Sequence, residues 1–118
     1  AFLPEEERKR LYKATGTAPG TGQKLAPAAE LEEELAGVRK RGYAITHGQK
    51  IAGAVGISAP VFGAGGTVIG SLGVTVPEQR IAEADEVELA DLVRRHANAL
   101  SRALGAPEPP LSQKAASA

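Results

Sequence analysis

The sequence has 118 residues, with 14 basic and 14 acidic side chains and 3% aromatic residues. This length corresponds to one domain or part of one, and the balanced charge argues against a dedicated nucleic-acid surface, which is usually markedly basic. The absence of cysteine excludes disulfides, thiolate metal sites and thiol nucleophiles, and two histidines do not build a zinc site by themselves, so no metal or cofactor is expected.

No apolar run approaches the length of a membrane span, and the first residues lack the basic start and apolar core of a signal peptide. We therefore expect a cytoplasmic protein with no membrane partner. Methionine is absent, so the chain lacks an initiator and is expected to be a piece of something longer.

Two helices are predicted in the first third of the chain. Residues 4–14 favour a short helix, because proline suits the first turn and glutamates precede the basic residues. Residues 15–27 are rich in glycine, proline and threonine, which predicts a loop. Apolar residues at helical spacing predict a second helix over 28–41, and Gly42 is the expected C-terminal stop.

A strand is predicted over residues 43–47, followed by a hairpin over 51–77 with its turn at 63–66. Bulky apolar residues alternate along one face of both hairpin strands, and this face suits a layer of helices. Closing the turn with Phe62 opposite Thr67 sets the register, which pairs Val61 with Val68, Ile57 with Leu72 and Val55 with Val74.

The other face of the hairpin consists of small residues and hydroxyls. The register pairs Ser58 with Ser71, Gly56 with Gly73, and Ala54 with Thr75. A face without bulk leaves room for a small polar ligand, which hydroxyls and exposed backbone can orient. Alternatively, small residues let a second sheet or a partner chain approach closely. Beside this face, Thr46 and His47 end the preceding strand; His47 either forms the pocket wall or is an exposed strand end.

A long helix is predicted over residues 82–104, ended by Gly105, and the proline- and alanine-rich tail 106–118 is expected to be disordered. For nucleophilic catalysis the candidates are Ser58, Ser71 and Ser101, but none sits in G-x-S-x-G and no histidine is placed beside them by spacing. His96 lies near the apolar stripe of the long helix and is typical of a packed residue. The sequence therefore does not indicate an enzyme, and a small serine hydrolase remains the weakest alternative.

Two segments together resemble a known family. ELAGVRKRGYA and ISAPVFGAGGTVIGSLGV, followed by Pro77, Arg80 and a long helix ending in ALSRALG, are similar to the C-terminal part of the effector-binding domain of IclR-type bacterial transcriptional regulators. The resemblance spans about residues 1–105. It implies an α+β domain of GAF/profilin-like type, with an antiparallel sheet and helices packed on one face, present here as a partial domain.

The resemblance also implies a function and a site. It implies a sensor that binds a small organic or aromatic acid, assembles as a homodimer or homotetramer, and reaches DNA only through a winged helix-turn-helix upstream of residue 1. The matching pocket positions are Thr46, Ala54, Gly56, Gly73 and Thr75. The family commonly has an acid where Thr46 stands, so the resemblance leaves two alternatives here, a different effector or a degenerate sensor. The alternative is a ligand-free GAF-like dimerisation module.

Overall fold

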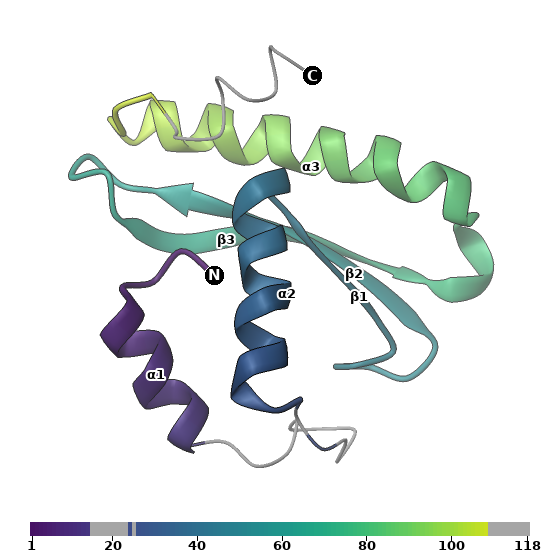
Figure 1. The fold of residues 1–118 in the computed structure, drawn as a ribbon. Coiled ribbons are helices and arrows are strands. Elements are labelled where there is room, and N and C mark those ends of the chain that lie inside the picture. The colour runs from purple at the N-terminus through teal and green to yellow at the C-terminus, as the bar shows by residue number, and fades with distance from the viewer. Residues whose placement is uncertain (15–23, 25, 109–118) are drawn as a thin grey trace.

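The computed structural model describes residues 1–14, 24 and 26–108. In this part of the chain an α+β fold is built from the helices and strands labelled in Figure 1. Their bounds are α1 Glu5–Ala14, α2 Ala28–Arg41, β1 Ala44–His47, β2 Ala54–Phe62, β3 Val68–Pro77, a 3-10 turn Glu78–Arg80, and α3 Glu83–Ala103. The predictions for residues 15–23, 25 and the tail 109–118 lie outside the described residues. Among the described residues, no helix is both long and apolar enough to cross a membrane.

The three strands form one antiparallel sheet in the order β1-β2-β3. The predicted hairpin is present, but its predicted register is wrong by two residues, because Ile57 pairs with Val74 instead of Leu72. The turn is one residue longer than predicted, with the Gly63 amide donating to the Thr67 carbonyl at 3.0 Å. A β-bulge then leaves Ile69 as an extra residue in β3. A shift of two residues keeps the side chains of residues 70–77 on their predicted faces. The bulge moves Val68 from the predicted bulky face to the small face, where it pairs with Phe62.

The bulky face of β2 and helix α3 form the core. Val55, Ile57, Ala59 and Val61 alternate along β2 and are at most 5% exposed. The helix supplies a stripe of small and medium residues, Ala90, Val93 and Ala97, that packs against them. Because these helix residues are short, α3 can pack closely on the strand. Figure 1 shows the helix running along one side of the sheet.

Ser101 fastens the end of α3 to the end of β2. Its side chain is fully buried; the hydroxyl donates to the Ala97 carbonyl at 2.8 Å and accepts the Phe62 amide at 2.9 Å. Strand β1 pairs only with residues 55–58 of β2 and ends before Phe62, so no carbonyl of β1 can accept the Phe62 amide. The serine therefore satisfies a buried donor that the sheet leaves open.

Helix α2 crosses in front of the sheet in Figure 1 and ends at Gly42, whose φ of 89° is the left-handed conformation expected of a helix stop. Near its end the buried Val38 lines a hollow on the small face of the sheet, together with Ser58. At the same end the ring of Phe2 meets that of Phe62 edge-on, with centroids 5.6 Å apart. Bulky groups thus cover only one end of the small face.

Candidate functional site

The uncovered part of the small face forms a cavity of about 290 Å³, which we call the polar cavity. It lies between β1, the loop after β1, β2 and β3. Its lining residues are Ala44, Thr46, Lys50, Ile51, Ala54, Gly56, Ser58, Ser71, Gly73, Val74 and Thr75. Seven of the eight residues predicted as ligand contacts are among them, all except His47.

Two glycines that line the polar cavity give it depth, because they carry no side chain. A Cβ atom added at Gly56 would lie 2.8 Å from Oγ1 of Thr46, and one added at Gly73 would lie 2.5 Å from Oγ of Ser58. The hydroxyls therefore lie directly beside the positions that a larger side chain would fill. Both glycines face the same side of the sheet, so the cavity owes its depth to them and its polarity to the neighbouring hydroxyls.

His47 lies on the opposite side of the sheet from the polar cavity, although it follows Thr46 directly. Its Nε2 is 3.0 Å and 3.1 Å from the two carboxylate oxygens of Glu86, in the first turns of α3. Side chains alternate along a strand, which sends Thr46 and His47 to different faces. Of the two sequence interpretations of His47, a wall of the pocket is therefore wrong.

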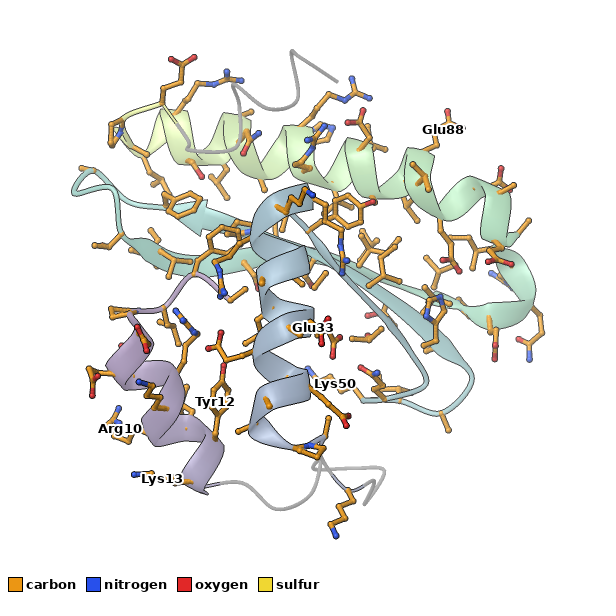
Figure 2. The ribbon with its side chains drawn as sticks, viewed as in Figure 1. Arg10, Tyr12, Lys13, Glu33, Lys50 and Glu88 are labelled. Atoms are coloured by element: carbon orange, nitrogen blue, oxygen red, sulfur yellow. The ribbon has the colours of Figure 1, made fainter. Side chains whose placement is uncertain are left out.

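Sequence reasoning missed Lys50 and Ile51 as lining residues, because Lys50 was assigned to the connection after the first strand and Ile51 to the start of the hairpin. Both lie in the loop after β1, and Lys50 is labelled in Figure 2. Among the described residues that line the polar cavity, Lys50 alone is charged, and it forms no ion pair with another described residue. The signal was available, because this loop follows directly on a strand whose end was already assigned to the pocket.

The serines do not form a catalytic arrangement. Within the described ranges, neither Ser58 nor Ser71 is hydrogen-bonded to a histidine, and His47 is engaged by Glu86 on the far face. A serine nucleophile needs a base within hydrogen-bond reach. The geometry therefore contradicts the serine hydrolase alternative.

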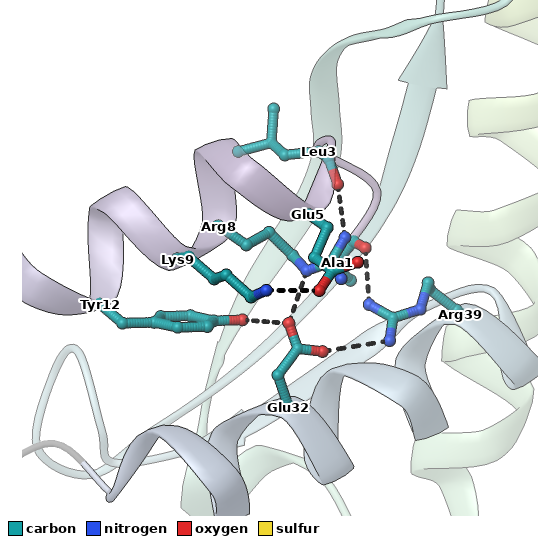
Figure 3. A network of polar contacts seen from close by, with 8 residues as sticks. All are labelled: Ala1, Leu3, Glu5, Arg8, Lys9, Tyr12, Glu32 and Arg39. Atoms are coloured by element: carbon teal, nitrogen blue, oxygen red, sulfur yellow. Dashed lines mark hydrogen bonds and ion pairs between the residues drawn. The ribbon is translucent and has the colours of Figure 1, made fainter.

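A second polar cluster centres on Glu32 and joins α1 to α2, as Figure 3 shows. One oxygen of Glu32 accepts from Arg8 Nε at 2.7 Å and from the Tyr12 hydroxyl at 2.8 Å, and the other accepts from Arg39 at 3.3 Å. Arg8 and Arg39 also donate to carbonyls of residues 1–3. The cluster thus fixes the N-terminal segment beside the sheet end where Phe2 packs.

We expect Glu32 to make stability depend on pH between about 4.5 and 2. Hydrogen bonds from Arg8 and Tyr12 lower its pKa from 4.5 to about 2 in the folded chain. Because the folded pKa lies below the unfolded one, the stabilisation is complete above pH 4.5 and is lost as the pH falls through this window. Urea unfolding of Glu32→Gln across this range should show a weaker pH dependence than the unchanged chain.

Glu33 provides the matched control for that experiment, because it is exposed on the same helix. The variant Glu33→Gln should keep the pH dependence of the unchanged chain. Equal pH profiles for both variants would show that the cluster around Glu32 does not supply the effect.

Comparison with known proteins places this architecture among bacterial transcriptional regulators. The family model described as "Bacterial transcriptional regulator IclR C-terminal" matches residues 1–102. The probable HTH-type transcriptional regulator ArcR of Halobacterium salinarum is 35% identical over 99 residues, covering 83% of this chain and 38% of that protein. The glycerol operon regulatory protein of Streptomyces griseus is 38% identical over 88 residues, which are 73% of this chain and 35% of that protein.

Solved structures show the same fold. The repressor BlcR of Agrobacterium tumefaciens superposes with a TM-score of 0.76 at 31% identity, covering 87% of this chain and 42% of that chain. The IclR protein of Thermotoga maritima gives a TM-score of 0.78 at 28% identity, covering 88% and 42%. These neighbours define the fold as that of a GAF-like regulator domain.

The chain belongs to the IclR family of transcriptional regulators and corresponds to its C-terminal domain, as the sequence resemblance indicated. The family prediction is confirmed, and so are the α+β fold with its antiparallel sheet and the expectation of a regulatory rather than an enzymatic protein. The helices lie on both faces of the sheet rather than on one, because α3 packs on the bulky face and Val38 of α2 lies on the small face. The chain spans only part of the length of these curated relatives, 38% of the Halobacterium protein and 35% of the Streptomyces protein.

Proposed function

We propose that residues 1–105 are the C-terminal part of an effector-binding domain, and that a small organic or aromatic acid binds in the polar cavity. The observation that supports this most directly is the charge of the lining, where Lys50 is joined by the hydroxyls of Thr46, Ser58, Ser71 and Thr75, with no acid among them. A cation and several hydroxyls at the edge of one cavity match the negative charge and the oxygens of a carboxylate.

In the proposed mechanism, DNA is contacted by a winged helix-turn-helix upstream of this chain, within a homodimer or homotetramer. The acid changes DNA affinity only if it binds one arrangement of that assembly better than another. The polar cavity is the place where such a difference in affinity would arise.

Replacing Lys50 with glutamine is expected to weaken carboxylate binding roughly fivefold to tenfold, since one exposed charge contact contributes about 1 kcal/mol. Calorimetric titration of the purified chain with benzoate measures this loss, and raising the salt concentration should reduce the difference between the two proteins. The variant Lys40→Gln removes the same charge from α2, away from the cavity lining, and should bind as the unchanged chain does. Equal binding by all three proteins, or no binding of benzoate at all, would contradict the proposal.

A further inference from the structure

The first two turns of α3 lack the contacts that hold the rest of the helix. The buried residues of α3 begin at Ala90, so none lies in residues 83–89. Ala82, which precedes the helix, forms no side-chain hydrogen bond that would cap it within the described part of the chain. The start of α3 therefore depends on contacts other than capping and burial in the core.

One ion pair joins this part of α3 to the sheet. Nε2 of His47, at the end of β1, lies 3.0 Å and 3.1 Å from the two carboxylate oxygens of Glu86. The other ion pairs of α3 seen in the described ranges, from Arg94 and Arg95 to Asp91, lie within the helix itself. The contact of His47 with Glu86 is an ion pair only while the imidazole carries a proton.

The hollow around this contact contains acids and no described cation besides the imidazole. Its other lining residues are Val55 of β2, Glu78 of the 3-10 turn, Ile81, and Glu83 of α3. Arg80 belongs to the same turn and Lys50 to the loop after β1, but neither lines this hollow, and Lys50 borders the polar cavity instead. A proton added to His47 therefore meets carboxylates from two elements, which attract the positive charge.

From this arrangement we infer that His47 and Glu86 form a proton-dependent clasp, which fastens the first two turns of α3 to the end of β1. A charged donor makes a stronger hydrogen bond to a carboxylate than a neutral one does. Imidazole side chains usually change their charge between about pH 5 and 8. As the pH rises through this range the clasp loses its charge, and the start of α3 opens more often, while the helix from Ala90 onward stays packed on the core.

Hydrogen exchange of the purified chain measures this opening without any ligand. In the first turns the amides of residues 87–89 donate to carbonyls one turn earlier. Their protection, corrected for the pH dependence of intrinsic exchange, should fall roughly threefold between about pH 5.5 and 8, as the loss of one exposed charge contact implies. The amides of residues 97–101, where α3 packs on the core, should keep their protection and serve as the internal reference.

Two pairs of variants test which groups carry the effect. His47→Gln keeps a hydrogen-bond donor that gains no charge, and it should remove the pH dependence. His96→Gln changes the other histidine of the chain, which is exposed on α3, and should keep it. Glu86→Gln should also remove the pH dependence, whereas Glu88→Gln, at an exposed position outside this hollow that Figure 2 labels, should keep it. Circular dichroism verifies that all four variants are folded.

Three results would overturn the clasp. The first is equal protection of residues 87–89 at both pH values in the unchanged chain. The second is a pH dependence that survives in His47→Gln or disappears equally in His96→Gln. The third is a parallel loss of protection at residues 97–101, because the whole helix would then open rather than its start. None of these results bears on the polar cavity, so the proposed function stands or falls separately.

Discussion

Replacing Ile57 with alanine is expected to lower the free energy of unfolding by about 3 kcal/mol, because truncating a buried isoleucine loses transfer energy and leaves a cavity. Ile57 is 0% exposed and lies in the middle of the core between β2 and α3. The helix residues opposite it are small, notably Ala90 and Ala97, and these cannot move large side chains into the space. Urea unfolding followed by circular dichroism measures the loss.

Ile69 is the matched control, since it is the same residue type on the neighbouring strand but 62% exposed. Ile69→Ala should change the free energy of unfolding by less than about 0.5 kcal/mol, as is usual for exposed positions. If the two alanine variants lost the same stability, the core would not lie on the face of β2 described here.

Replacing Gly56 with valine is expected to weaken benzoate binding more than a hundredfold while the fold is kept. An added Cβ atom lies 2.8 Å from Oγ1 of Thr46, so the valine methyl groups occupy the floor of the polar cavity. The near atom is the end of a rotatable side chain, and valine suits a strand, so the backbone has no need to move. Calorimetric titration with benzoate measures the loss, and circular dichroism checks the fold.

Gly65 allows the same substitution away from the site. It lies in the turn between β2 and β3, nothing lies within 4 Å of an added Cβ atom, and its φ is not positive. Gly65→Val should therefore bind benzoate as the unchanged chain does. If Gly56→Val bound benzoate as tightly as the unchanged chain does, the ligand would not lie in the polar cavity.

Helix ends and strand faces were predictable because local chemistry determines them. The bounds of α2 agree with the prediction at both ends, since apolar spacing starts the helix and Gly42, in the left-handed conformation, stops it. The two faces of β2 were also predictable, because alternation along a strand depends on sequence alone.

The register of the hairpin was not predictable from the same pattern. The bulge at Ile69 and the longer turn shift the pairing by two residues. Side chains alternate with a period of two, so the apolar pattern is the same before and after such a shift and does not distinguish the two registers. The bulge lies beside Phe62, whose amide is bound by Ser101 from α3. That contact spans 39 residues, so no local signal reveals it.

The candidate site divides in the same way. The glycines and hydroxyls of the polar cavity follow from strand alternation, and this explains why most of the predicted residues line it. The hollow lined by Phe2, Val38 and Ile69 could be found only from the tertiary structure, because it combines residue 2, α2 and β3. The Glu32 cluster likewise joins side chains separated by 24 residues, and its charges resemble ordinary solvated helix faces in the sequence.

The pair between His47 and Glu86 gives the alternation of β1 a mechanical consequence. Thr46 borders the polar cavity, while its neighbour His47 holds the first turns of α3 from the other side of the sheet. A displacement of the backbone at Thr46 is shared by the next residue, because one rigid peptide plane joins them. If the polar cavity binds a ligand as proposed, strand β1 would connect that ligand to α3 on the other surface of the sheet, through Thr46 on one side and the contact of His47 with Glu86 on the other.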